Sequence, residues 1–198
     1  WDLVGRLQRL AIPEREDRAA LAALRRSLGK EPGYSADVAR IVQPALKDDA
    51  PPAEAEAYYL VASLFGLLPR HCDTPRDPSP PWAQQGLGWS LRRARLRDDG
   101  EADPGVERRF VALLDSRPDA LGEHLRHLIK LTMSRDDCFD IDYRKLLRDI
   151  LDWDHPEHRV QRQWAAGFWS GGQSTAAGED ADPINDDAND AADDRDDE

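Results

Sequence analysis

The 198-residue sequence has few cysteines and no long apolar run. Its two cysteines, Cys72 and Cys138, lie far apart and form no Cys-x-x-Cys pattern, so neither a disulfide framework nor a zinc knuckle is expected. No stretch approaches the roughly 20 apolar residues of a membrane-spanning helix, and no secretory leader is evident. We therefore expect a cytoplasmic protein without a membrane partner.

Strand-forming residues and catalytic motifs are also scarce. Val, Ile and Thr total 16 residues, whereas Leu and Ala total 49. Because Leu and Ala favour helices and β-branched residues favour strands, this imbalance predicts an all-α fold. The sequence has no glycine-rich phosphate loop, Gly-x-Ser-x-Gly elbow or Cys/His nucleophile pair. It therefore predicts no catalytic residue, no cofactor and no enzymatic activity.

The net charge of −12 is concentrated near the C-terminal end. Residues 171–198 contain eleven acidic residues and one basic residue, Arg195, so their net charge is −10 and that of residues 1–170 is −2. This acidic tail has one aliphatic side chain larger than alanine, Ile184, and no aromatic residue, so we predict that it is disordered. A solubilising appendage is the preferred interpretation, and a tail that folds back to compete with DNA is the alternative.

The apolar residues of 1–170 recur at helical spacing in nine segments. We expect helices at Trp1–Ile12, Pro13–Leu28, a segment capped by Ser35 that bends or ends near Pro44, Pro51–Leu68, Leu87–Arg97, Pro104–Ser116, Asp119–Met133, Asp142–Trp153 and Pro156–Trp169. Residues 69–88 contain five prolines and no periodicity, which indicates a loop. We predict a compact bundle of about eight to nine helices in two lobes, residues 1–69 and 88–170, joined by a proline-rich loop at 70–87.

Arginine accounts for 23 of the 27 basic residues, and the bases cluster on several predicted helices. The clusters are Arg25 and Arg26, then Arg92, Arg93, Arg95 and Arg97, then Arg108 and Arg109, then Arg126 and Lys130. Like charges one helical turn apart repel unless an anion lies between them, and guanidinium groups suit phosphate oxygens. One interpretation is a phosphate-binding surface. The charge pattern alone favours the other, a solvated face neutralised by acids such as Asp98 and Glu107.

Two histidine pairs and three tryptophans are weaker candidates for function. His124 with His127, and His155 with His158, are each spaced three residues apart. A zinc site needs a third convergent ligand, so we predict no metal site, and a metal-dependent hydrolase is kept as an alternative. The tryptophans at the ends of the last two helices are Trp153, Trp164 and Trp169. We interpret them as core or interface residues and not as a platform for nucleic-acid bases.

Five segments in the second half of the chain occur in a familiar order. They are Gly88-Trp-Ser-Leu-Arg-Arg-Ala-Arg-Leu, Glu107-Arg-Arg-Phe-Val-Ala-Leu-Leu, His124-Leu-Arg-His-Leu-Ile-Lys-Leu, Ile141-Asp-Tyr-Arg-Lys-Leu-Leu-Arg-Asp-Ile-Leu-Asp-Trp and Val160-Gln-Arg-Gln-Trp-Ala-Ala-Gly-Phe. In this order they resemble the CasB-type small subunit of the type I-E CRISPR surveillance complex, Cascade. The resemblance is firmest over residues 87–169, and the acidic tail departs from it.

This resemblance implies a non-catalytic, all-α subunit present in two copies beside the crRNA-bearing backbone subunits and the large subunit of Cascade. It further implies binding to the crRNA–target DNA R-loop. The residues that match the family's basic motifs are Arg25, Arg26, Arg92, Arg93, Arg108, Arg109 and Arg126; the family pattern favours Gly at the position of Arg92. Arg95, Arg97, Lys130, Arg144 and Lys145 join them only by proximity in sequence.

We expect these cations to converge from separate helices into one basic surface. The main alternative is a free-standing helical interaction module or adaptor that binds an acidic protein. A helix-turn-helix regulator is disfavoured, because no predicted helix pair has a compact turn followed by base-reading polar residues.

Overall fold

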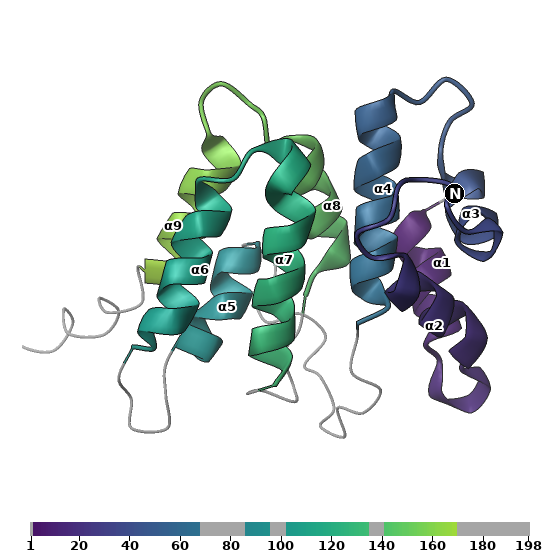
Figure 1. The fold of residues 1–198 in the computed structure, drawn as a ribbon, viewed down its shortest axis with the longest axis horizontal. Coiled ribbons are helices and arrows are strands. Elements are labelled where there is room, and N and C mark those ends of the chain that lie inside the picture. The colour runs from purple at the N-terminus through teal and green to yellow at the C-terminus, as the bar shows by residue number, and fades with distance from the viewer. Residues whose placement is uncertain (1, 68–85, 96–101, 135–140, 170–198) are drawn as a thin grey trace, which may run out of the picture.

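The computed structural model describes residues 2–67, 86–95, 102–134 and 141–169 (Figure 1). Over these ranges the protein forms nine α-helices and two short 3-10 helices and contains no β-strand. This confirms the predicted all-α class. None of the helices in these ranges is long and apolar enough to cross a bilayer. The predicted loop at 70–87 and the tail at 171–198 fall almost wholly outside the described residues, so the division of the chain at these boundaries stays a prediction.

The N-terminal group of helices is built around α4. Helices α1 (Leu3–Leu10), α2 (Arg18–Ser27) and α3 (Ala36–Val42) lie on one side of α4 (Pro52–Phe65). Helix α4 is apolar on more than one face, and Val61, Ala62 and Leu64 are fully buried in it. A helix that is apolar nearly all round belongs in the centre of a core.

The C-terminal group forms two layers of helices. Helices α6 (Pro104–Leu114) and α7 (Pro118–Met133) run antiparallel as a hairpin, in front of α5 (Leu87–Arg95), α8 (Tyr143–Leu151) and α9 (Arg159–Trp169) in the view of Figure 1. The backbones of α5 and α9 touch at Gly88, where an added Cβ would lie 2.0 Å from the carbonyl oxygen of Trp164. Only glycine permits so close a contact between the two helices.

The two groups share one hydrophobic core along the seam between α4 and the C-terminal helices. The rings of Phe65 on α4 and Tyr143 on α8 pack edge to face, with centroids 5.0 Å apart. Gly122 on α7 leaves room for Leu60 on α4, whose Cδ1 would lie 3.1 Å from an added Cβ. The continuous core fixes the position of the hairpin relative to α4.

Two of the predicted helix starts are wrong. Pro13–Arg15 forms a separate 3-10 turn, and α2 begins at Arg18 because the Asp17 side chain caps it by accepting a hydrogen bond from the Ala20 N–H at 2.9 Å. Helix α9 begins at Arg159 rather than Pro156, because His158 has a left-handed φ of 48° that no α-helix allows. The predicted bend near Pro44 is confirmed, since α3 passes there into the 3-10 turn Gln43–Ala45.

Candidate nucleic-acid interface

The α6–α7 hairpin begins at a buried cap. The carboxylate of Asp103 accepts hydrogen bonds from the N–H groups of Gly105, at 2.6 Å, and Val106, at 3.3 Å. The N–H of Asp103 donates to the carbonyl oxygen of Arg95 at 2.7 Å, which ties the start of α6 to the end of α5. Because α6 and α7 are antiparallel, the first turns of α6 lie beside the last turns of α7.

Two exposed arginines lie on the first turns of α6. Arg108 Nε donates to the carbonyl oxygen of Pro104 at 3.1 Å, and Arg109 Nη1 donates to that of Gly105 at 2.9 Å. Each acceptor is one turn back in the same helix. Within the described ranges, neither guanidinium forms an ion pair with a carboxylate, so both keep donors available for an external anion.

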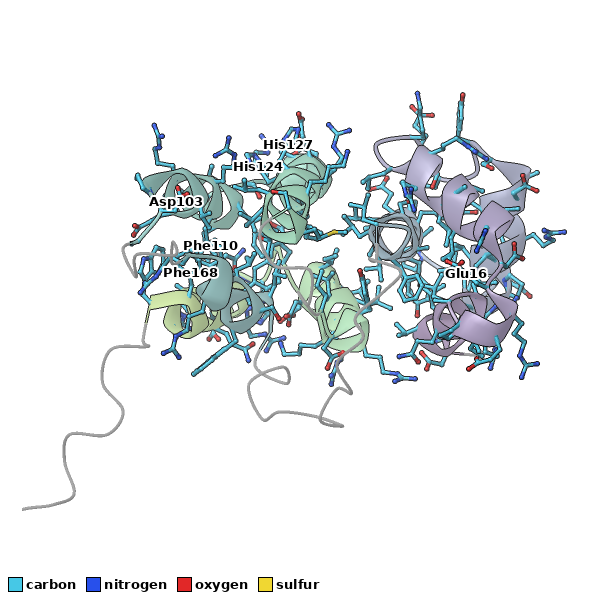
Figure 2. The ribbon with its side chains drawn as sticks, turned by 90° about the horizontal axis from the view of Figure 1, so that it is seen from below. Glu16, Asp103, Phe110, His124, His127 and Phe168 are labelled. Carbon is cyan, nitrogen blue, oxygen red and sulfur yellow. The ribbon has the colours of Figure 1, made fainter. Side chains whose placement is uncertain are left out.

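The facing turns of α7 add two more cations. Lys130 is exposed, and Arg126 is half-buried with its Nη2 3.3 Å from Nε2 of His127. Figure 2 shows His124 and His127 on the outer side of α7, on the opposite side of the hairpin layer from the Phe110 and Phe168 rings. We call Arg108, Arg109, Arg126 and Lys130 the hairpin cations.

Charge is sorted along the length of the hairpin. The exposed acids Asp115, Asp119 and Glu123 lie towards the turn that joins α6 to α7, where Arg117 Nε is 3.6 Å from Asp119 Oδ1. The hairpin cations lie in the other half. Near Arg108 and Arg109, Asp103 caps α6 and Glu107 accepts a hydrogen bond from Trp169 Nε1 at 2.9 Å, whereas the exposed Glu123 lies one turn before Arg126 on α7. Arg108, Arg109 and Lys130 can therefore attract a polyanion, while the acids nearer the turn repel it.

The arginines of α5 pack against aromatic rings of the same protein. Arg92 Cζ lies 5.2 Å from the centroid of the Trp89 ring, and Arg95 Cζ lies 5.5 Å from that of Phe168. Such cation–π contacts orient a guanidinium without neutralising it. Arg93 belongs to α5, but its side chain is not among those that the structure describes. Arg97 lies outside the described residues.

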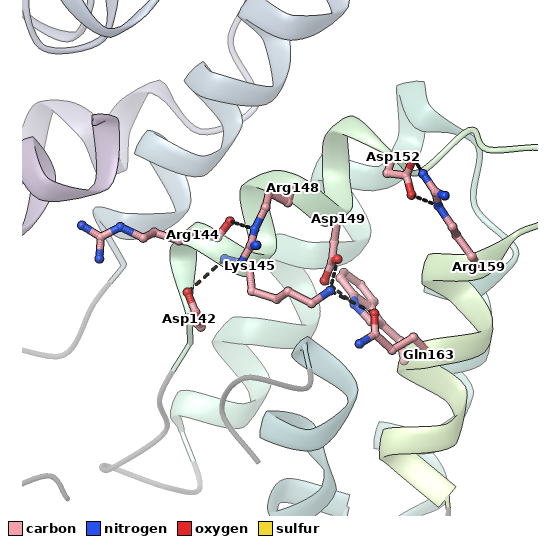
Figure 3. Close-up of polar contacts among 9 residues, drawn as sticks. Asp142, Arg144, Lys145, Arg148, Asp149, Asp152, Arg159 and Gln163 are labelled. Carbon is pink, nitrogen blue, oxygen red and sulfur yellow. Dashed lines mark hydrogen bonds and ion pairs between the residues drawn. The ribbon is translucent and has the colours of Figure 1, made fainter. Parts of the chain in front are cut away.

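Arg25, Arg26 and Arg144 lie away from the hairpin cations. Arg25 Nε donates to the carbonyl oxygen of Gly66 at the end of α4, at 2.9 Å, and Arg26 is exposed on α2. Arg144 forms an ion pair with Asp2, which joins α8 to the cap of α1, and Figure 3 shows it pointing away from Lys145 and Asp149. This guanidinium lowers the pKa of the Asp2 carboxyl below its usual value. Those of the predicted residues that the structure describes thus form separate groups and do not converge on one surface.

A polar network between α8 and α9 was not predicted from the sequence. Lys145 forms an ion pair with the buried carboxylate of Asp149 and donates to Gln163 Oε1 at 2.9 Å (Figure 3). Trp164 Nε1 donates to the other oxygen of Asp149 at 2.8 Å. The four-residue spacing of Lys145 and Asp149 on a helix was the one sequence signal for this pair.

A surface hollow of about 400 Å³ adjoins this network and includes Lys145, Arg148, Asp152 and Arg159 in its lining. Arg159 forms an ion pair with Asp152, and its guanidinium lowers the pKa of that carboxyl. Two of the three cations in the hollow are therefore neutralised by a carboxylate, unlike those of the hairpin.

The predicted histidine pairs differ in their surroundings. His155 Nδ1 accepts a hydrogen bond from the N–H of Glu157 at 3.2 Å, within the turn before α9. His124 and His127 lie on the outer side of α7, where His127 Nε2 is 3.3 Å from Arg126 Nη2. The described residues contain no group of three or more His, Cys, Asp or Glu side chains placed to hold a metal ion.

These features define the class as a small all-α protein whose two helical groups share one hydrophobic core. A family model described as "CRISPR-associated protein Cse2" matches residues 20–169, so the chain belongs to the Cse2 family. This confirms the family predicted from the five sequence segments.

Individual relatives agree with this assignment. The CRISPR-associated protein Cse2 of Thermus thermophilus is 36% identical over 157 residues, which are 79% of this chain and 82% of that protein. The crystal structure of M. ruber CasB is similar with a TM-score of 0.66 and 28% identity, over 85% of this chain and 90% of that one. A chain of a structure described as a "CRISPR RNA-guided surveillance complex" is similar with a TM-score of 0.60 and 28% identity, over 84% of this chain and 88% of that one.

Proposed function

We propose that the chain is the non-catalytic small subunit of a type I-E Cascade complex and that it binds DNA strands to stabilise the crRNA-guided R-loop. Membership of the Cse2 family and similarity to a chain of a CRISPR RNA-guided surveillance complex support the assembly. The partners are the crRNA-bearing backbone subunits and the large subunit, with two copies of this chain per complex, in the cytoplasm.

The observation that carries the DNA-binding part is the set of hairpin cations. They lie in one half of a rigid hairpin, and the described residues offer Arg108, Arg109 and Lys130 no carboxylate partner. Guanidinium and ammonium groups bind phosphate oxygens without reading bases. Such binding suits a subunit of an RNA-guided complex, because base pairing with the guide supplies the sequence specificity.

Phosphate binding on the hairpin is sufficient to favour the R-loop. The RNA–DNA heteroduplex is about as stable as the DNA duplex that it replaces, so a modest added affinity for an opened strand shifts the equilibrium. The hairpin cations supply this affinity by releasing counterions from the strand. Arg95, at the end of α5 whose carbonyl oxygen accepts from the Asp103 N–H, extends the same electrostatic field.

Charge reversal on the hairpin tests this function. In the assembled complex, Arg108→Glu with Arg109→Glu should lower R-loop stability by about tenfold or more at low salt, because both phosphate contacts become repulsive. Permanganate footprinting of the opened strand measures the effect. The control is Arg117→Glu, a single charge reversal at the turn of the hairpin, which should leave R-loop stability unaltered; Arg108→Glu alone is its match in size.

Two outcomes separate this proposal from the adaptor alternative. If the variant with both arginines reversed forms an R-loop of wild-type stability, the hairpin does not bind DNA in the complex. Failure of the wild-type chain to co-purify with crRNA-bearing subunits would remove the Cascade assignment itself and leave a free-standing interaction module.

A further inference from the structure

Trp169 differs from the other two tryptophans of the last two helices. Trp153 and Trp164 are 2% and 0% exposed and belong to the core, as predicted, whereas Trp169 at the end of α9 is 38% exposed. It lies against α6, so an aromatic surface is open to solvent beside the helix that carries Arg108 and Arg109.

The exposed ring is held in a fixed orientation. Trp169 Nε1 donates to Glu107 Oε1 at 2.9 Å. Its ring meets those of Phe110 and Phe168 edge-on, at centroid distances of 5.3 and 5.2 Å and interplanar angles of 65° and 84°. Phe110 and Phe168 are themselves stacked at 4.0 Å inside the core. A ring ordered in this way loses little conformational freedom when a ligand binds to it.

Charged groups of both signs lie near this ring. The Glu107 carboxylate, which accepts the indole hydrogen bond through Oε1, directly precedes Arg108 and Arg109 on α6. The Arg95 guanidinium lies over the Phe168 ring, next to Trp169 in the chain. Proteins that bind single strands use this combination, in which cations hold phosphates and an aromatic face stacks on a base.

We propose that Trp169 is a stacking platform for one unpaired DNA base, whose neighbouring phosphates are held by the hairpin cations. This inference rests on the proposed function and adds to it a preference for single-stranded over duplex DNA. Duplex bases already stack on one another and cannot cover the indole, whereas an unpaired base can. The hairpin cations alone would hold both forms of DNA.

The test uses the full chain at low salt, with single-stranded oligonucleotides that carry one 5-iodouracil base and with duplexes of the same sequence. Photo-cross-linking followed by peptide mapping should locate the cross-link at Trp169. Replacement by Leu keeps an apolar side chain against Phe110 but removes the stacking face. Trp169→Leu should abolish the cross-link, weaken single-strand binding by about fivefold to a hundredfold, and leave duplex binding within about twofold.

Two further variants keep the test interpretable. Trp169→Phe retains an aromatic face without the Glu107 hydrogen bond and should restore most of the single-strand affinity. Arg108→Glu with Arg109→Glu should weaken single-strand and duplex binding together. Urea unfolding of each variant shows whether the packing on Phe110 and Phe168 is preserved.

The outcomes distinguish this inference from the function on which it rests. If the arginine variant loses binding while Trp169→Leu binds single strands like the wild type, or if the cross-link maps elsewhere or fails to form, the platform is overturned and the basic surface stands. If neither variant changes DNA binding, both proposals fall. If Trp169→Leu impairs only incorporation into the crRNA-bearing complex, the exposed ring contacts a protein subunit and the platform is likewise overturned.

Discussion

Arg6 and Arg25 of the N-terminal helices and Arg108 and Arg109 of the α6–α7 hairpin all donate to backbone carbonyl oxygens, but at different distances along the chain. Arg6 reaches the carbonyl oxygen of Ile41 at 3.2 Å and Arg25 that of Gly66 at 2.9 Å, across 35 and 41 residues of chain. Arg108 and Arg109 reach only carbonyl oxygens one turn back in their own helix. A bond between distant segments fixes tertiary structure, whereas a bond within one turn leaves the guanidinium available to a ligand.

This comparison predicts which arginines support the fold and which are available to a ligand, a distinction that clustering in the sequence does not make. Arg25 and Arg108 each belong to an Arg-Arg pair, and the sequence predicts the same role for both. Their acceptors differ because the end of α4 lies against α2, while the first turns of α6 face solvent. The predictions below test this division, from the largest expected effect to the smallest.

The largest effect on stability is expected at the contact between α5 and α9, the helices that lie behind the hairpin. Gly88→Ala would place a Cβ 2.0 Å from the carbonyl oxygen of Trp164 and force α5 and α9 apart. We expect a loss of about 3 kcal/mol or more in the free energy of unfolding, measured by urea denaturation.

The matched control for this change is Gly122→Ala. Its added Cβ would meet only Leu60 Cδ1, the end of a flexible side chain, at 3.1 Å. The expected loss in the free energy of unfolding is therefore much smaller. If Gly88→Ala and the wild type unfold at the same urea concentration, the backbone contact between α5 and α9 does not stabilise the C-terminal group.

A moderate effect should distinguish the neighbours Arg25 and Arg26. Arg25→Ala removes the hydrogen bond to the Gly66 carbonyl oxygen and should destabilise the fold by about 1 kcal/mol. Arg26→Ala and Arg108→Ala remove exposed side chains that tie no second element of the described structure, and each should stay within about 0.5 kcal/mol of the wild type. Equal losses in all three variants, by urea denaturation, would erase the distinction between the two regions.

The sequence predicted the helices well and the partners of the charged side chains poorly. Apolar periodicity is a local signal, so it located the nine helices of the described ranges, and the start predicted at Asp142 is correct because the Asp142 side chain caps α8. Errors arose where two start signals competed, as at Pro13 and Asp17. The acceptors of Arg25 and Arg144 lie far away in the chain, so only the folded structure reveals them.

The same reasoning applies to the aromatic residues of the candidate site. Helical spacing assigns Trp164 and Trp169 to the end of one amphipathic helix and does not separate them. The structure does, because Trp169 is 38% exposed beside α6, whereas Trp164 is enclosed between α5 and α8.

A small, pH-dependent effect is expected at the seam between the two groups. Arg144 lowers the pKa of Asp2 in the folded protein, so the ion pair stabilises the fold above the ordinary aspartate pKa of about 3.9. This contribution is lost as the pH falls through the lowered pKa of the folded state. Both side chains are about half exposed, at 55% and 50%, so the effect should stay below about 1 kcal/mol.

Comparison with Arg144→Gln isolates this contribution. The free energy of unfolding, followed from about pH 6 down to about pH 3, should fall more steeply in the wild type than in the variant, because only the wild type has an ion pair to lose. Parallel curves for the two proteins would show that the pair does not connect α8 to α1 in solution.

The salt dependence of single-strand binding tests the central claim most directly. Each phosphate contact releases about 0.7 counterion from a single strand, so Arg108→Gln with Arg109→Gln should reduce the slope of log K against log salt by about 1.4. Arg25→Gln, which removes an arginine that already donates to Gly66, should leave the slope unchanged. A hairpin variant whose slope equals that of the wild type would contradict the claim that these exposed arginines hold the DNA backbone.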